Sequence, residues 1–197
     1  MLSTALLVLT LSQVDMTPML ERGPMVLIED SKGKFSQATA VMLIDAPPDL
    51  VWGVISKMED FKTFVPKVLT SDVERKEGKL EYEVHFVIDV PGIDTDYTVK
   101  YWPDPVARTI RGLWVKGDLK GSIWEWKVEK APGNRTLLSH TSSVKNFSAI
   151  AQSIEDEQQT VTVGINVASG LAAVKAVKSH CEALAHPPAG GTAAAKP

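Results

Sequence analysis

The chain has a single cysteine, Cys181, among its 197 residues. One cysteine can form neither an internal disulfide nor a thiolate metal cluster, so the chain is not a disulfide scaffold. Basic residues are not in excess either, since 21 Lys and Arg stand against 24 Asp and Glu, for a formal net charge of −3. A nucleic-acid-binding domain needs a basic face, and we therefore predict no nucleic-acid partner.

Motifs for nucleotide, metal and nucleophilic chemistry are missing as well. No G-x-G-x-x-G or P-loop sequence occurs, and no paired His or Cys spacing suggests zinc. No G-x-S-x-G elbow is present, and Cys181 lies on the apolar side of a predicted helix, where a buried small side chain is expected. We predict no cofactor and no metal, and we favour a non-enzymatic protein over an enzyme.

The chain has no long hydrophobic run. The segment Leu2–Leu11 (LSTALLVLTL) is too short to span a bilayer. It has the length of the apolar core of a signal peptide, but no Lys or Arg precedes Arg22. Two interpretations of residues 1–22 stay open: a signal peptide, with a periplasmic or secreted protein, or a docked apolar helix on a cytoplasmic one.

The remaining composition is that of a globular protein. Hydrophobic residues make up 44% of the chain and charged residues 23%. We predict a single domain over residues 23–185. Residues 186–197 are mostly Pro, Gly and Ala, which bury little, and predict a disordered tail.

Most of this domain is predicted to consist of strands, with a short helical region after the second strand. Met25–Glu29 and Phe35–Asp45 predict two strands joined by a turn, and the prolines of Ala46–Asp49 predict the start of a short helix. A second short helix or a turn is predicted over 59–66. The clearest strand is Lys79–Val90, whose strict alternation is typical of an antiparallel sheet with one covered face. Further strands are predicted at 97–101, 107–116, 119–129 and 135–146; the pattern does not distinguish the inner and outer faces of 107–116 and 135–146.

A long helix closes the domain, from about Ser148 to Leu184. Gly164 and Gly170 lie inside it and indicate either a kink or close packing, or room for a ligand against the backbone. We predict an α+β fold in which a curved antiparallel sheet wraps around this helix and leaves space for a ligand. The apolar positions predicted to face the sheet recur at steps of three, four or seven: Ile154, Val161, Ile165, Ala168, Leu171, Val174, Val177, Cys181 and Leu184.

Two stretches resemble a known superfamily. From Ala46 to Val68 the chain reads A-P-P-x-x-V-W-x-V-I and then F-x-x-F-V-P-K-V, and from Leu171 to Leu184 it reads LAAVKAVKSHCEAL. Their order and spacing over residues 35–185 resemble START/SRPBCC helix-grip domains, particularly the polyketide cyclase/dehydrase and lipid-transport branch with its coenzyme Q-binding relatives. The resemblance implies about seven strands curved around the C-terminal helix, with Met25–Glu29 added before them, and an apolar cavity for lipids, quinones or polyketides. It implies no universal catalytic residues, because such sites are defined by cavity shape.

Aromatic side chains provide the best candidates for a ligand site. They can line a cavity between sheet and helix, or they can fill an ordinary core. Of the four histidines, His140 is the one predicted to point inward, either as a structural residue or as a proton donor. The predicted ligand-binding residues are Phe64, Tyr82, Phe86, Tyr97, Tyr101, Trp124, Trp126, His140, Ile165 and Ala168.

Three functions remain in competition. The first is binding or carriage of a hydrophobic small molecule without chemistry. The second is a cyclase or dehydratase that uses the same cavity, with His140 or a tyrosine as proton donor. The third is a protein-interaction or membrane-interface module with transient membrane contact, which is expected if the aromatic face is tightly packed and an apolar patch is exposed.

Overall fold

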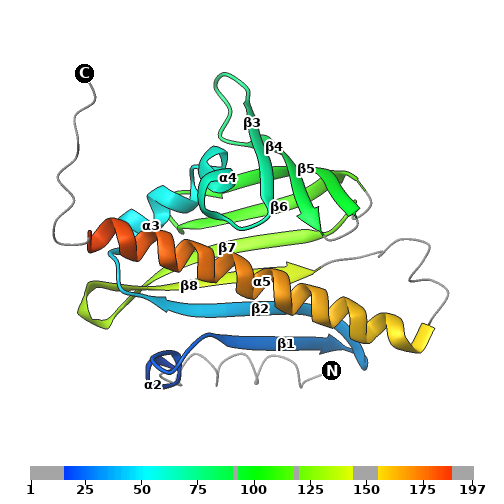
Figure 1. The fold of residues 1–197 in the computed structure, drawn as a ribbon, viewed down its shortest axis with the longest axis horizontal. Helices are drawn as coiled ribbons and strands as arrows, with labels where there is room; N and C mark the ends of the chain where they lie inside the picture. Colours follow the sequence, from blue (N-terminus) through cyan, green and yellow to red (C-terminus); the bar gives the residue numbers. More distant parts are fainter. Residues whose placement is uncertain (1–15, 91–92, 118–119, 144–154, 188–197) are drawn as a thin grey trace, which may run out of the picture.

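A computed structural model describes residues 16–90, 93–117, 120–143 and 155–187 (Figure 1). Most of the predicted N-terminal apolar segment and of the predicted tail, residues 1–15 and 188–197, therefore lies outside the described residues.

The fold is α+β, as predicted. Among the described residues, eight strands form one antiparallel sheet in the order β1-β2-β8-β7-β6-β5-β4-β3, curved around the C-terminal helix α5, Glu155–Ala185 (Figure 1). The strands are β1 Met25–Ser31, β2 Lys34–Ile44, β3 Val68–Arg75, β4 Tyr82–Val90, β5 Ile93–Asp104, β6 Thr109–Lys116, β7 Ile123–Ala131 and β8 Arg135–Ser143.

The β1–β2 hairpin forms where the sequence predicts a turn. Its two loop residues, Lys32 and Gly33, have φ angles of 57° and 75°, the left-handed pair that matches the twist of a two-residue hairpin. The Gly33 amide donates a hydrogen bond to Asp30 Oδ1 at 3.3 Å, which holds the turn closed.

Two details of the sheet differ from the prediction. β3 was not predicted. It is an edge strand, and its charged residues, such as Asp72 and Glu74, interrupt the alternation of apolar and polar residues by which strands are recognised. The strand predicted at 97–101 is longer in the structure, since β5 continues to Asp104 and Pro103 pairs with Ile110. Proline is tolerated there because it lies near the end of the strand, where few ladder hydrogen bonds remain to be lost.

Short helices follow β2 and close one end of the sheet. Helix α3, Pro48–Ile55, begins at the predicted prolines and buries Val51 and Ile55 completely. Asp49 lies in its first turn, where a carboxylate favours the helix dipole, and pairs with Arg108. The other short helices are α2 Thr17–Leu20, η1 Met58–Asp60, α4 Phe61–Phe64 and η2 Pro132–Asn134.

Helix α5 crosses the sheet over β2 and β8 (Figure 1). Its C-terminal half buries Val174, Val177 and Cys181 completely, as predicted. The predicted face is wrong at Ile165 and Ala168, which are exposed while Asn166 and Gly170 are buried. It is also wrong at Leu184, near the end of the helix, which is 54% exposed. Ile154 lies outside the described residues. In an α-helix, a side chain three residues further along lies about 60° around the helix axis. Repeated steps of three therefore place Ile165 roughly 120° and Ala168 roughly 180° around the axis from Val177.

The main core lies between the concave face of the sheet and the helices. It includes the inward rows of β4 and β5, among them Val84, Tyr97 and Val99. The strand predicted over Lys79–Val90 begins at Tyr82 in the structure, and Leu80, which precedes it, is 71% exposed. Within the described ranges, none of the helices combines the length and the apolar character needed to cross a bilayer.

Candidate functional site

A cavity of about 370 Å³ separates the concave face of the sheet from α5. The strands β4, β5, β7 and β8 provide its floor, the turn after α4 provides one wall, and α5 provides the other. The size is within the range of small-molecule sites, and most of the lining side chains are apolar, as such sites require. The lining residues are Phe61, Val65, Pro66, Lys67, Val68, Phe86, Ile88, Asp89, Tyr97, Tyr101, Trp124, Trp126, His140, Ser169, Ala172 and Ala173.

Six rings on this lining touch one another in one unbroken series, which we call the aromatic series. Every contact is tilted or edge-to-face, the arrangements that ring quadrupoles favour. In order, the centroid distances are 6.2 Å for Phe61–Trp126, 4.3 Å for Trp126–His140, 5.8 Å for His140–Trp124, 5.9 Å for Trp124–Tyr97 and 5.5 Å for Tyr97–Phe86.

The mouth of the cavity is less aromatic than the floor. Lys67, in the turn after α4, has a φ of 69° and its Nζ lies 2.7 Å from Asp89 Oδ2 on β4. The Asp89 amide also donates to the Lys67 carbonyl at 2.8 Å, so the turn is tied to the sheet. Across the opening, α5 presents only the small side chains of Ser169, Ala172 and Ala173, which leave the space open.

His140 is a buried titratable side chain on the cavity lining. It is 3% exposed, and burial lowers its pKa to about 4, so the imidazole is neutral at pH 7. Its Nδ1 is buried and has no hydrogen-bond partner among the described residues. This nitrogen faces α5, because a Cβ added at Gly170 would lie 3.7 Å from it.

Tyr97 and Tyr101 also have strongly perturbed acidity. Both are almost completely buried, and burial raises the pKa of each hydroxyl well above 10. Both phenols therefore stay protonated across the physiological range and can act toward a ligand only as neutral hydrogen-bonding groups.

Six of the ten predicted ligand-binding residues lie on the cavity lining, and the other four do not. Phe64 stacks on His180 of α5, with ring centroids 4.2 Å apart, and so joins α4 to α5 outside the cavity. Tyr82 lies at the far end of β4, against Tyr101. Ile165 and Ala168 lie on the exposed side of α5. The six on the lining are Phe86, Tyr97, Tyr101, Trp124, Trp126 and His140.

Sequence reasoning missed the wall formed by the turn and by α5. Val65, Pro66 and Val68 belong to the F-x-x-F-V-P-K-V phrase, of which only Phe64 was among the predicted ligand-binding residues. Ala172 and Ala173 carry no signal of their own, because small side chains in a helix indicate close packing as readily as open space.

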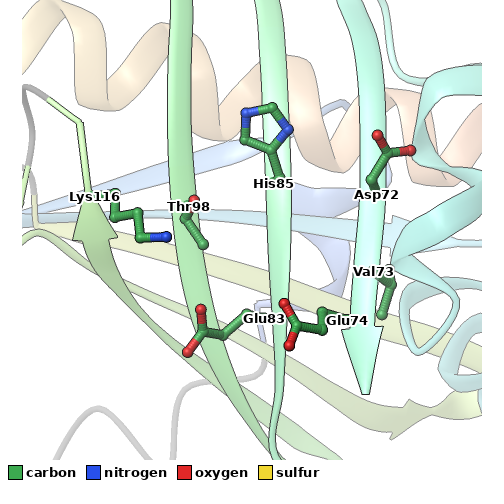
Figure 2. A pocket seen from close by; sticks show the side chains of 7 residues that line it. All are labelled: Asp72, Val73, Glu74, Glu83, His85, Thr98 and Lys116. Carbon is green, nitrogen blue, oxygen red and sulfur yellow. The ribbon is translucent and has the colours of Figure 1, made fainter. Parts of the chain in front are cut away.

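A second hollow, of about 290 Å³, lies on the opposite face of the sheet (Figure 2). Asp72, His85, Thr98 and Lys116 are register partners across β3, β4, β5 and β6, and their side chains form a row there. His85 is on this wet face, as its alternation predicts, with Nε2 2.7 Å from Asp96 Oδ1. The mixed charges and open position are those of a solvated sheet face.

Family comparison agrees with the fold and the cavity. Residues 36–182 match the family model described as polyketide cyclase / dehydrase and lipid transport. The chain belongs to this family. No curated protein sequence matches it.

Solved structures of similar shape carry several descriptions. The Zhui aromatase/cyclase from Streptomyces sp. R1128 is 20% identical, with a TM-score of 0.68 over 79% of this chain and 98% of that one. A START superfamily protein from Mycobacterium smegmatis is 12% identical, with a TM-score of 0.59 over 76% and 99%. A STAR-related lipid transfer protein from Xanthomonas axonopodis is 16% identical, with a TM-score of 0.53 over 81% and 93%. At these identities the likeness establishes the shared fold.

Among the residues that the structure describes, no three His, Cys, Asp or Glu side chains converge to hold a metal ion. What the cavity offers chemically is a large apolar surface, neutral ring hydroxyls and one neutral imidazole.

Proposed function

We propose that this protein binds a hydrophobic small molecule, such as a lipid, a quinone or a polyketide-like compound, in the cavity between the sheet and α5. The observation that carries the proposal is the 370 Å³ space itself, bounded by the aromatic series and open at the Lys67–Asp89 pair. An interaction module with a solidly packed aromatic face would leave no such space.

The driving force would be removal of apolar surface from water. At about 25 cal/mol per Å², burying roughly 300 Å² of ligand surface contributes about 7 kcal/mol before ordering costs are subtracted. The cavity wall is already formed, so little of this is spent on rearranging the protein.

Native mass spectrometry of the full chain purified from its own host tests the proposal. We expect a bound apolar molecule that is released by organic extraction and can be added back. Protein that carries nothing and takes up no apolar compound would overturn it.

Blocking the cavity provides a matched test. Ala172 lines the mouth on α5 and is exposed, so Ala172→Trp should fill the opening without disturbing the core. Ala183 is exposed on the same helix, away from the lining, and Ala183→Trp is the control. We expect Ala172→Trp to lose most ligand binding and Ala183→Trp to keep it.

The position of His140 favours an enzymatic use of the same cavity as the second candidate. A neutral imidazole can donate a hydrogen bond to a substrate carbonyl, although a pKa near 4 makes it a weak base at pH 7. Incubation with a linear poly-β-ketone thioester, followed by mass spectrometry for loss of water, tests this function. His140→Phe should then abolish turnover while leaving binding intact, and an unchanged rate would remove the assignment.

A further inference from the structure

The two edge strands of the sheet, β3 and β1, differ in how they are protected. Helices η1 and α4 lie against β3, and ion pairs join them to it. Lys62 Nζ of α4 lies 3.7 Å from Asp72 Oδ1, and Arg75 Nη2 lies 3.2 Å from Glu59 Oε2 of η1. Charged side chains and a covering segment prevent an edge strand from pairing with another chain. The β3 edge is therefore closed to a further strand.

The β1 edge has an apolar centre. β1 pairs with β2 on one side, and no described strand pairs with it on the other (Figure 1). Val26, Leu27 and Ile28 follow one another in its middle, and Leu27 is 36% exposed and Ile28 57%. An edge strand of this kind offers unpaired N–H and C=O groups to any strand that matches it. β1 also precedes residues 36–182, the part of the chain that matches the family model, so the match does not account for it.

One added strand would cover side chains on both faces of β1. Val26 and Ile28 are register partners of Ala40 and Ala38, which are buried on the concave face near α5. Leu27, between them, points to the convex face. A second strand alongside would therefore bury apolar surface above and below the sheet, in addition to forming ladder hydrogen bonds.

The charges at the two ends of β1 are opposite. Arg22 precedes the strand and Asp30 lies near its end, and neither has an ion pair among the described residues. Two antiparallel copies bring the Arg22 end of each strand to the Asp30 end of the other. A pair centred on Val26 places Met25 opposite Leu27 of the second copy and Arg22 opposite its Asp30. Opposite charges directly across an antiparallel pair stabilise the pairing.

We infer that β1 is an interface between two copies of this chain, which pair antiparallel along this strand and join their sheets into one. A second copy is the partner because the strand is complementary to itself, both in its apolar centre and in its charged ends. A single strand pair buries less than the roughly 1,200–2,000 Å² of a standard interface, so we expect a dissociation constant on the order of 10 µM. The described cavity lining comes from other elements, so the inference does not depend on the proposed function.

Sedimentation velocity of the full chain, over concentrations from about 1 to about 200 µM, tests the interface. We expect the sedimenting species to change from one chain to two across this range. A single chain at every concentration would overturn the inference.

A charge placed on the edge should separate the copies. We expect Ile28→Lys to raise the dissociation constant at least tenfold, because it places a lysine at the apolar centre of the contact. Leu69→Lys on β3 is the matched control, since Leu69 is 54% exposed on the opposite edge strand and should tolerate the change without an effect on association. A dimer that survives Ile28→Lys, or that both substitutions weaken equally, would place the contact elsewhere and overturn the inference.

A charge exchange tests the antiparallel arrangement. Arg22→Asp and Asp30→Lys each place like charges opposite one another, so each variant alone should associate about tenfold more weakly. A mixture of the two variants restores opposite charges at both ends, and native mass spectrometry should show the mixed dimer in excess over either pure dimer. Asp30 also accepts a hydrogen bond from the Gly33 amide, but Asp30→Lys loses this bond in the pure and the mixed dimer alike. No preference for the mixed dimer would overturn the antiparallel pairing.

Residues 1–15 are the competing occupant of this edge, since they precede α2 and β1 in the chain. A variant that lacks residues 2–15 separates the two occupants. The full chain and the shortened chain should dimerise alike. Dimers of the shortened chain alone would show that these residues cover β1 in the full chain, and would overturn the second copy as its partner.

Discussion

Gly170 on α5 lies against the imidazole of His140 on β8. A Cβ at position 170 would lie 3.7 Å from His140 Nδ1 and 3.3 Å from the Cβ of Ala40 on β2. Of the two readings of this glycine, room for a ligand and close packing, the structure shows close packing. The missing side chain lets the helix approach β2 and β8, and this approach sets one boundary of the cavity.

A larger side chain at this contact should lift the helix from the sheet. We expect Gly170→Val to lower the free energy of unfolding by about 1–3 kcal/mol, as overpacked sites do. Gly164 has nothing within 4 Å of its would-be Cβ, so Gly164→Ala should raise stability by up to about 1 kcal/mol through helix propensity alone. Urea unfolding of both variants measures the contrast, and unchanged stability in Gly170→Val would mean that α5 is not held at this point.

Gly112 and Tyr101 form a similar pair within the sheet. They are register partners, and a Cβ at Gly112 would lie 2.6 Å from Tyr101 Cε1. Gly112→Ala should therefore push the Tyr101 ring out of place and cost about 1–3 kcal/mol. A double-mutant cycle checks the cause: the same substitution should cost less in a Tyr101→Leu background. Equal costs in both backgrounds would place the clash elsewhere.

The buried His140 should make stability depend on pH. Burial lowers its pKa from 6.5 to about 4, so between these values the unfolded chain binds a proton that the folded chain does not. The free energy of unfolding therefore keeps its full His140 contribution above pH 6.5. It decreases as the pH falls from 6.5 to 4, by a total of roughly 3 kcal/mol. Urea unfolding at pH 7 and pH 4.5 should show a larger loss for the wild type than for His140→Phe. Parallel losses would mean that the imidazole is protonated in the folded state.

Cys181 should be unreactive in the folded protein. It is completely buried, and burial raises the pKa of its thiol to about 12, so almost no thiolate is available to an alkylating reagent. Iodoacetamide labelling followed by mass spectrometry should proceed at the rate of unfolding and accelerate in urea. Rapid labelling of the native chain at pH 8 would contradict the position of α5.

Much of the fold could be predicted because alternation and element order are local properties. The inward row of β4 and the start of α3 at Pro47 and Pro48 follow from periodicity and backbone chemistry. Periodicity did not assign a face to β8, and His140 was predicted to point inward only by comparison with the other histidines. The edge strand β3 could not be predicted in this way, because an edge strand needs no apolar face to mark it.

The extent of the cavity was decided by tertiary structure. Alternation assigns a side chain to a face of the sheet but not to a position over that face. Tyr82 and Phe86 therefore have the same pattern, yet only Phe86 reaches the cavity. The apolar spacing of α5 likewise includes Ile165 in the sequence, although the helix turns this side chain away from the sheet in the structure. The sequence alone determined that a curved sheet would pack against a long helix. The packing of Gly170, the turn after α4 and the aromatic series decided where a space would remain between them. Only the tertiary structure could decide this, because a cavity depends on distances between segments that are far apart in the chain.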